Sequence, residues 1–156
     1  MLTKVPQIEI ISFSNTANAP CPEYLEQSLE VFGEALPNVP PTIIRSAAQR
    51  QGAVGFVALG DTGVAHGAAI LSLNTRPYKG TSEACLEYLG VIKTERQNGL
   101  GTKLMIAVEG TCSGAGKQIL SLQSSSARAA LRLYTRRGFS MYDPMKREMV
   151  KRLGNR

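Results

Sequence analysis

Apolar residues recur along this chain with two spacings, and the change from one spacing to the other separates predicted helices from predicted strands. The clearest helical stripe has apolar residues at i, i+4, i+7 and i+11: Leu25, Leu29, Phe32 and Leu36. Side chains at these intervals share one face of an α-helix. Pro22 suits the first position of that helix, because the N–H that it lacks would have no partner there. Residues 42–50 predict a second, short helix.

Between residues 52 and 92 the pattern becomes typical of strands. The apolar runs Val54–Leu59 and Val64–Leu73 flank a turn bounded by glycines, Gly60–Gly63, and so predict a β-hairpin. A further apolar strand is predicted over Ala84–Ile92, and a first strand of the chain over Ile8–Phe13.

The second half of the chain predicts alternating helices and short strands. A helix that is apolar on most faces begins near Lys103 and ends at Gly114 or Gly116. A short buried strand is predicted over Ile119–Leu122. A helix follows over Ala127–Arg137, with Ser124–Ser126 offering an N-cap and Gly138 a C-cap. Two last strands are predicted over Phe139–Tyr142 and Lys146–Leu153. No repeat or linker interrupts this order, so we expect one mixed α/β domain over residues 1–156.

Composition narrows the class of protein. A hydrophobic content of 43% and a charged content of 19% suit a compact globule, and no apolar run reaches the roughly 18 residues of a membrane span. The N-terminus lacks the apolar core of a signal peptide. Three widely spaced cysteines match no zinc or disulfide pattern, which favours a reducing compartment, the cytoplasm. His66 is the only histidine, which argues against a histidine-based triad or a metal site with several histidine ligands.

Charge is distributed unevenly. Residues 117–156 contain ten of the 18 lysines and arginines and two acidic residues, a balance of +8, whereas the remainder carries −2. A basic C-terminal quarter favours an anionic ligand or partner. A polyphosphate cofactor and nucleic acid both satisfy this condition, and so does a solvated basic surface.

The sequence Arg96-Gln97-Asn98-Gly99-Leu100-Gly101 joins the predicted strand to the following helix. Backbone N–H groups at a helix start lack intrahelical acceptors, and the helix dipole places partial positive charge there. Glycine lets the backbone approach a phosphate without a Cβ in the way. We therefore expect the N–H groups from Gln97 to Thr102 to bind a pyrophosphate, although a plain tight turn would show the same pattern.

Spacing limits the choice of cofactor. A dinucleotide-binding turn requires a third glycine where this chain has Leu104, and a P-loop requires the order Gly-Lys-Ser/Thr rather than Gly101-Thr102-Lys103. The remaining pattern, R-x-x-G-x-G, resembles the acyl-CoA-binding motif of the GNAT superfamily of N-acetyltransferases.

A second stretch also resembles this superfamily. Its members share the pattern N-x-x-A-x-x-L-Y-x-x-x-G-F, which this chain matches at five positions: Ala130, Leu133, Tyr134, Gly138 and Phe139. The asparagine of the pattern, which helps to bind CoA, is Ala127 here, and Ser126 or Ser125 is the substitute that we consider. The resemblance covers residues 84–142 and implies a GNAT-like acyl-CoA N-acyltransferase fold: a mixed, mostly antiparallel sheet flanked by helices.

The resemblance also implies the chemistry. Acetyl-CoA would be the co-substrate, held by the turn, by Arg96 and by the main chain of Leu89 and Val91. Tyr134 would be the general acid for the CoA thiolate, although its spacing also fits a core residue. Glu87, on the same strand face as Leu89, is the candidate base, with Glu83 in reserve. A solvated Glu87 fits the sequence equally well.

These motifs do not identify the acceptor substrate. The resemblance implies a primary amine of a small molecule or a protein, and homodimers are frequent in the superfamily. Two alternatives remain: an enzyme that acetylates aminoacyl-tRNA, as toxins of the superfamily do, and a non-catalytic CoA-binding module. The acidic residues between Glu23 and Glu34 could attract a cationic amine or could simply be solvated.

Overall fold

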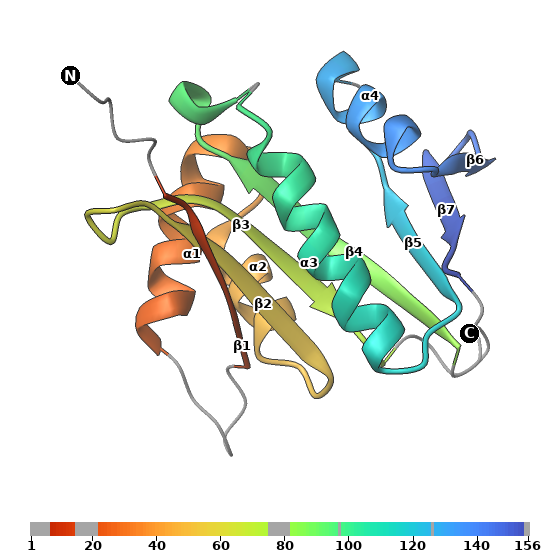
Figure 1. Cartoon of the computed structure of the whole chain (residues 1–156), viewed down its shortest axis with the longest axis horizontal. Helices are drawn as coiled ribbons and strands as arrows, with labels where there is room; N and C mark the ends of the chain where they lie inside the picture. Colours follow the sequence, from red (N-terminus) through yellow and green to blue (C-terminus); the bar gives the residue numbers. More distant parts are fainter. Residues whose placement is uncertain (1–6, 15–21, 75–81, 97, 126, 155–156) are drawn as a thin grey trace.

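A seven-stranded sheet forms the centre of the molecule in a computed structural model, which describes residues 7–14, 22–74, 82–96, 98–125 and 127–154 (Figure 1). The strand order is β1-β2-β3-β4-β5-β7-β6. The strands are β1 (Glu9–Phe13), β2 (Ala53–Leu59), β3 (Ala65–Ser72), β4 (Glu83–Val91), β5 (Ile119–Gln123), β6 (Ser140–Asp143) and β7 (Glu148–Arg152). Only the pairing of β4 with β5 is parallel. The predicted mixed, mostly antiparallel sheet is therefore confirmed.

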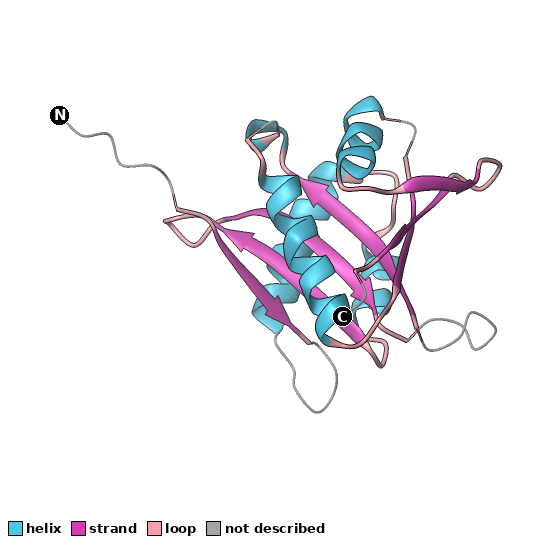
Figure 2. Cartoon of the chain, turned by 45° about the vertical axis from the view of Figure 1, so that its right-hand side comes forward, coloured by secondary structure: helices cyan, strands magenta, loops and turns pink. Residues whose placement is uncertain are grey.

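Helices cover both faces of this sheet (Figures 1 and 2). One face carries α1 (Pro22–Ala35) and α2 (Pro41–Ala48), and the other carries α3 (Leu100–Gly114) and α4 (Arg128–Arg136); a short 3₁₀ helix, η2 (Lys93–Glu95), follows β4. The apolar stripe predicted for α1 supplies buried Leu25 and Phe32 to the first face. The helix predicted to be apolar, α3, supplies Leu104, Met105 and Val108 to the second. None of the helices in the described ranges is long and apolar enough to cross a membrane.

The strand β4 is irregular in two ways. Leu86 and Tyr88 pair with the adjacent residues Leu71 and Ile70 of β3, so Glu87 is the extra residue of a β-bulge. Moreover, β5 pairs only with the first part of β4, as far as Leu86, and Figure 1 shows the two strands diverging beyond this point toward the start of α3 and toward α4. No described strand pairs with this side of residues 87–91, so the edge is open.

Close packing requires small residues where α3 crosses the sheet and meets α4. A Cβ added at Gly67 of β3 would lie 2.9 Å from Leu104 Cδ1. One added at Gly101 would lie 3.1 Å from Leu133 Cδ2 of α4. The beginning of α3 is therefore in direct contact with α4, at the end of the sheet where β4 and β5 have separated.

The two helices on this face end in the same way. At the end of α4, the Phe139 N–H donates to the Tyr134 carbonyl at 2.9 Å and the Gly138 N–H donates to the Thr135 carbonyl at 3.0 Å. With φ of 93° at Gly138, these bonds form a Schellman motif. Gly116, with φ of 77°, ends α3 through the corresponding bonds. The predicted glycine stops of both helices are thus confirmed, with each glycine just after the C-cap residue.

The start of α4 differs from the prediction. Its N-cap is Ala127, which makes no side-chain capping bond, and the helix begins at Arg128. The Ser125 hydroxyl instead accepts a hydrogen bond from the Ala127 N–H at 3.3 Å, before the helix starts. Serine hydroxyls readily make such local bonds, which compete with capping. The Ser124 hydroxyl donates to the carbonyl of Ser125, so neither of these two serines caps α4.

Candidate functional site

The open edge of β4 presents main-chain groups of Leu89 and Val91. The Ile92 N–H donates to the His66 carbonyl at 2.9 Å, so the main chain of Ile92 faces β3. Because N–H and C=O groups alternate in direction along a strand, those of Leu89 and Val91 face away from β3. They therefore point to the side that β5 has left. A linear molecule with amide groups could pair there as an additional strand.

The turn that follows leaves a group of N–H donors unbonded within the helix. Gly99 is the N-cap of α3 with φ of 78°, a conformation that favours glycine. The first helical bond within α3 runs from the Lys103 N–H to the Gly99 carbonyl at 3.1 Å. The N–H groups of Gly99, Leu100, Gly101 and Thr102 thus precede the hydrogen-bond ladder. No acidic residue lies in the first turn of α3, so the helix dipole is free to act on an anion.

Side chains around the turn hold it in place. Arg96 Nε donates to the Val91 carbonyl at 3.1 Å, which ties the turn back to the end of β4. Asn98 Nδ2 donates to Glu95 Oε2 at 3.2 Å, and Glu95 Oε1 lies 3.4 Å from His66 Nδ1. That last separation is too long for a strong hydrogen bond, and His66 Nδ1 is buried without another partner among the described residues. Arg96 thus braces the turn and engages the carbonyl of Val91, while the Val91 N–H is left on the open edge.

Tyr134 lies on α4 and is buried, with 7% of its surface exposed. Its ring contacts Phe139 edge-on at a centroid distance of 5.9 Å, the apolar contact that often accompanies a Schellman motif. Burial raises the pKa of its hydroxyl to about 12, so the phenol is protonated at neutral pH. Tyr134 shares one apolar cluster with Leu100 and Leu104, against which Leu89 and Val91 also pack. The turn, the open edge and Tyr134 therefore lie around a common core.

The candidate bases occupy two different positions on β4. Glu87 is the half-buried bulge residue, just beyond the last residue of β4 that pairs with β5. Burial of Tyr88 raises the pKa of its hydroxyl, and the charge of Glu87 raises that pKa further. Glu83 lies at the other end of the strand, where its carboxylate accepts a hydrogen bond from the Ser121 hydroxyl at 3.2 Å. Glu87 is thus at the opening between β4 and β5 and Glu83 is in the closed part.

Two of the predicted cofactor-binding residues, Gln97 and Ser126, lie outside the described residues. Of the others, Arg96, Asn98, Gly99 and Thr102 are exposed, Gly101 is half-buried, and the Leu100 side chain is in the core. Ala127, at the position of the asparagine in the motif, is exposed at the start of α4.

A buried ion-pair cluster was not predicted from the sequence. Glu109 of α3, with 8% of its surface exposed, accepts two bonds from Arg137, at 3.0 Å from Nε and 3.1 Å from Nη2. It also accepts one from Lys151 Nζ of β7 at 2.5 Å. The signal available in the sequence was an acidic residue four positions after Met105 and three before Cys112, on the buried side of α3. Burial, and next the charge of Glu109, raise the pKa of the Cys112 thiol to about 12, which keeps it protonated and unreactive.

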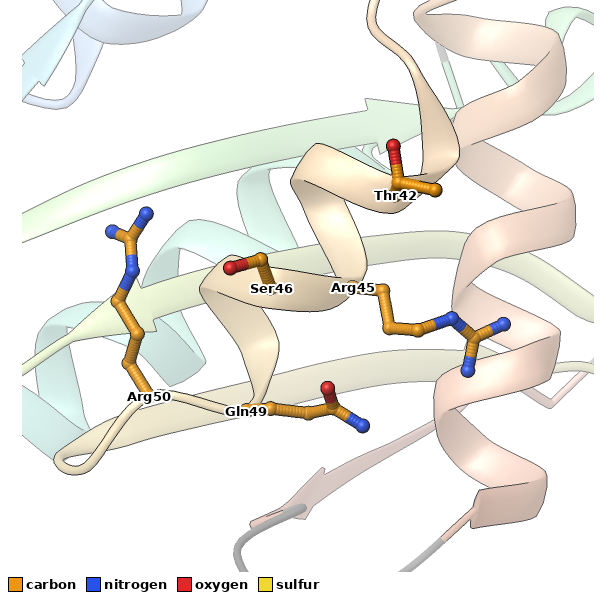
Figure 3. A pocket seen from close by; sticks show the side chains of 5 residues that line it. All are labelled: Thr42, Arg45, Ser46, Gln49 and Arg50. Carbon is orange, nitrogen blue, oxygen red and sulfur yellow. The ribbon is translucent and has the colours of Figure 1, made fainter.

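A hollow on the surface lies elsewhere. It measures about 390 Å³ and lies over one exposed side of α2, where it is lined by Thr42, Arg45, Ser46, Gln49 and Arg50 (Figure 3). Arg45 is already paired with Glu26 of α1 at 2.7 Å. Since α2 lies on the opposite face of the sheet from α3 and α4, this hollow is separate from the open edge of β4 (Figure 1).

The described residues contain no cluster of three or more histidine, cysteine or acidic side chains that could bind a metal ion. What they do contain is a set of backbone donors for an anion, an open strand edge and a protonated phenol around one apolar cluster. This arrangement suits an elongated ligand with a phosphate at one end and amide groups along its length.

Comparisons with known proteins agree with the fold. Several solved structures share the fold over nearly the whole chain. The ribosomal-protein-S18-alanine N-acetyltransferase from Escherichia coli has a TM-score of 0.76, 18% sequence identity, and coverage of 96% of each chain. A GNAT family N-acetyltransferase from Escherichia coli, in complex with CoA, has a TM-score of 0.79 and 15% identity over 99% of this chain and 86% of that one. Tetrahymena GCN5 has a TM-score of 0.72 and 18% identity over 95% and 96%.

At these identities the structural likeness establishes the fold. Comparison with curated proteins found no match. The sequence comparison is more specific, because residues 17–139 match the family model described as the acetyltransferase (GNAT) family. Since this match spans most of the chain, the protein belongs to the GNAT family of acetyltransferases.

Proposed function

We propose that the protein transfers the acetyl group of acetyl-CoA to a primary amine of a small molecule or a protein. The observation that carries the proposal is the start of α3, whose first N–H groups precede the helical hydrogen bonds, beside the open edge of β4 and with Tyr134 on the same apolar cluster. In the reaction, the amine nitrogen forms a bond to the thioester carbonyl carbon and the carbon–sulfur bond breaks. The products are the acetylated amine and CoA, whose sulfur gains a proton.

The donor would bind along the open edge. The N–H groups from Gly99 to Thr102 would bind the pyrophosphate, and each charge-assisted hydrogen bond would contribute roughly 1.5–3 kcal/mol. Gln97 and Ser126 are further contacts expected from the family motifs. The amides of the pantetheine arm would pair with the main chain of Leu89 and Val91, as an added strand does. The structural neighbour in complex with CoA supports this class of cofactor.

Tyr134 would donate the proton that the leaving sulfur requires. A thiol has a pKa of about 8.5, so CoA is a moderate leaving group that benefits from an acid. A phenol whose pKa is raised to about 12 by burial stays protonated, and therefore able to donate, throughout the physiological range. The Tyr134 ring packs edge-on against Phe139, which limits the positions that the ring can take.

Glu87 would accept the proton that the amine loses. An alkyl amine of pKa about 10.4 is neutral in only about one molecule in 10³ at pH 7, which corresponds to roughly 4–5 kcal/mol. The bulge places Glu87 where β5 leaves β4, at the opening between the strands. Transfer of the proton through a water molecule is compatible with this position.

The acidic side of α1 bears on the choice of amine. Two of its four glutamates are already engaged, since Glu26 pairs with Arg45 and Glu34 Oε2 accepts the Lys93 N–H at 2.6 Å. Glu23 and Glu30 remain exposed. The attraction that α1 offers a cationic amine is therefore weaker than four free carboxylates would give.

The proposal is tested by measuring CoA release from acetyl-CoA in the presence of small amines, peptides with free amino groups, and aminoacyl-tRNA. We expect turnover with an amine acceptor that exceeds hydrolysis of acetyl-CoA alone. CoA that raises the melting temperature without turnover of any acceptor would instead indicate a CoA-binding module.

A second acceptor class rests on one observation. Arg128, Arg132 and Arg136 are exposed on one side of α4, where they could contact the phosphates of tRNA. For that acceptor, affinity should fall steeply as salt is raised, whereas a small-amine acceptor should respond weakly. A flat salt response with aminoacyl-tRNA would remove this candidate.

A further inference from the structure

The helix that carries Tyr134 has few anchors. Tyr134 is its only buried residue, its N-cap makes no side-chain bond, and its backbone contacts with other elements are sparse. Three arginines at i, i+4 and i+8 repel one another along its exposed side, Arg128, Arg132 and Arg136. A nine-residue helix with these properties has little intrinsic stability, so its position depends on contacts near its ends.

The sheet does not fix α4 relative to the phosphate-binding turn either. Beyond Leu86 and Leu122 no strand pairing connects β4 with β5. The turn at Gly99 belongs to the β4–α3 side of this opening, whereas α4 follows β5. Any fixed distance between the turn and Tyr134 must therefore come from side-chain contacts between α3 and α4, which lie on the same side of the sheet (Figures 1 and 2).

Within the described residues, two contacts add to the apolar cluster that α3 and α4 share. Leu133 packs against Gly101 at the start of α3. The second is the cluster of Glu109, Arg137 and Lys151, in which a nearly buried carboxylate uses both oxygens to bind a guanidinium on α4's C-cap residue and an ammonium on β7. A bidentate carboxylate–guanidinium pair fixes orientation as well as distance.

Glu109 and Arg137, the two residues of this ion-pair cluster on α3 and α4, are each connected to the site through the backbone of their helix. Glu109 lies eight positions after Gly101 in the same continuous helix. On the other side, the Arg137 N–H donates to the Tyr134 carbonyl at 3.1 Å, and the Schellman motif fixes the same carbonyl through Phe139. A displacement of Arg137 would therefore move Tyr134.

We propose that Glu109 is a positioning residue, which sets the distance between the phosphate-binding turn and the Tyr134 hydroxyl by holding Arg137 across the open sheet. This inference rests on the proposed function, because it assigns Glu109 a role in proton donation to the leaving sulfur. Glu109 itself does not touch the reacting atoms. Its loss should lower kcat while the KM for acetyl-CoA stays nearly unchanged, since the turn on α3 remains intact.

The test is a double-mutant cycle with Glu109→Gln and Tyr134→Phe, each variant assayed well below its melting temperature. We expect Glu109→Gln to lower kcat about tenfold or more in the wild-type background and less than twofold in the Tyr134→Phe background. Arg137→Lys, which keeps the charge and loses the second N–H bond, should give a smaller loss of the same kind. Glu26→Gln, which breaks an ion pair on the opposite face of the sheet, is the matched control and should leave kcat unchanged.

The outcomes separate the two proposals. Equal losses from Glu109→Gln in both backgrounds, or a lower melting temperature with normal kcat, would show a structural role only and overturn the inference. A wild-type protein that turns over no acceptor would overturn the proposed function, and the positioning role with it.

Discussion

The turn before α3 and the turn after α4 each contain a glycine in the left-handed region, Gly99 with φ of 78° and Gly138 with φ of 93°. At Gly99 the chain enters a helix, and the following N–H groups have no partners in it. At Gly138 the chain leaves a helix, and the Schellman bonds engage the last carbonyls. The same backbone conformation thus leaves N–H donors available for a ligand at Gly99, whereas at Gly138 it lets the last carbonyls of α4 accept hydrogen bonds. The first turn is suited to bind a ligand, and the second to hold a side chain, Tyr134.

The largest effect on turnover is expected from a change of the Tyr134 side chain. Tyr134→Phe removes the hydroxyl and keeps the ring that contacts Phe139, so the fold and CoA binding should persist. General acids typically contribute 10²–10⁴-fold, and we expect turnover to fall by about 10²-fold or more. Steady-state turnover, with CoA-induced stabilisation as the binding control, checks this. Unchanged turnover would mean that Tyr134 is only a core residue.

Gly99→Asp tests the turn that leaves its donors free. A carboxylate among those N–H groups would repel the pyrophosphate and occupy its donors, and CoA affinity should fall roughly 100-fold. Gly99→Asn has nearly the same shape without the charge and should lose much less. Gly63→Asp, at a hairpin glycine with φ of 79°, controls for the backbone strain alone. If Gly99→Asp bound CoA as tightly as Gly63→Asp does, the phosphate site would be elsewhere.

Alkaline unfolding tests how completely Tyr134 is held. Its pKa is raised to about 12 in the folded protein, whereas the unfolded phenol ionises near 10. The corresponding stabilisation is complete below about pH 10 and is lost as the pH rises toward 12, with a size on the order of 2–3 kcal/mol. Denaturant unfolding of wild type and Tyr134→Phe across this range should show a shallower loss in the variant.

Cys112→Ala is the companion measurement, because the Cys112 thiol has a pKa raised to about 12 by the same cause and titrates in an overlapping range. An alkaline loss of stability that is the same in Tyr134→Phe and wild type would contradict the burial of the phenol.

The smallest effects come from the two Schellman glycines. Gly138→Ala and Gly116→Ala each place a Cβ in the left-handed region, at a cost of about 1–2 kcal/mol, or a few degrees of melting temperature. Only Gly138 ends the helix of Tyr134, so Gly138→Ala should also lower turnover, by up to about tenfold. Thermal unfolding and steady-state kinetics of the pair check this. Equal turnover in both variants would remove the functional difference between the two helix ends.

Local rules predicted most of the fold. Apolar spacing located the helices, and glycines located both helix ends and the turn at Gly99. The serine run did not cap α4, because Ser125 bonds to the Ala127 N–H before the helix begins. The bulge at Glu87 leaves no trace in the apolar pattern, since it depends on the register with β3.

The ion-pair cluster around Glu109 could not be predicted for a different reason. Glu109 lies 28 positions before Arg137 and 42 before Lys151 along the chain. Only the packing of α3, α4 and β7 brings the three residues together. Motifs described the local turns of the candidate site, whereas the distance between those turns depends on these remote contacts.

The most direct test of the account is a titration of the ¹⁵N-labelled protein with CoA, followed residue by residue through amide chemical shifts. The largest changes should occur at Gly99 to Thr102 and along the β4 edge at Leu89 and Val91, with little change at Gly63 and Gly116. Changes concentrated instead around Thr42 to Arg50, in the hollow over α2, would contradict the assignment of the phosphate-binding turn.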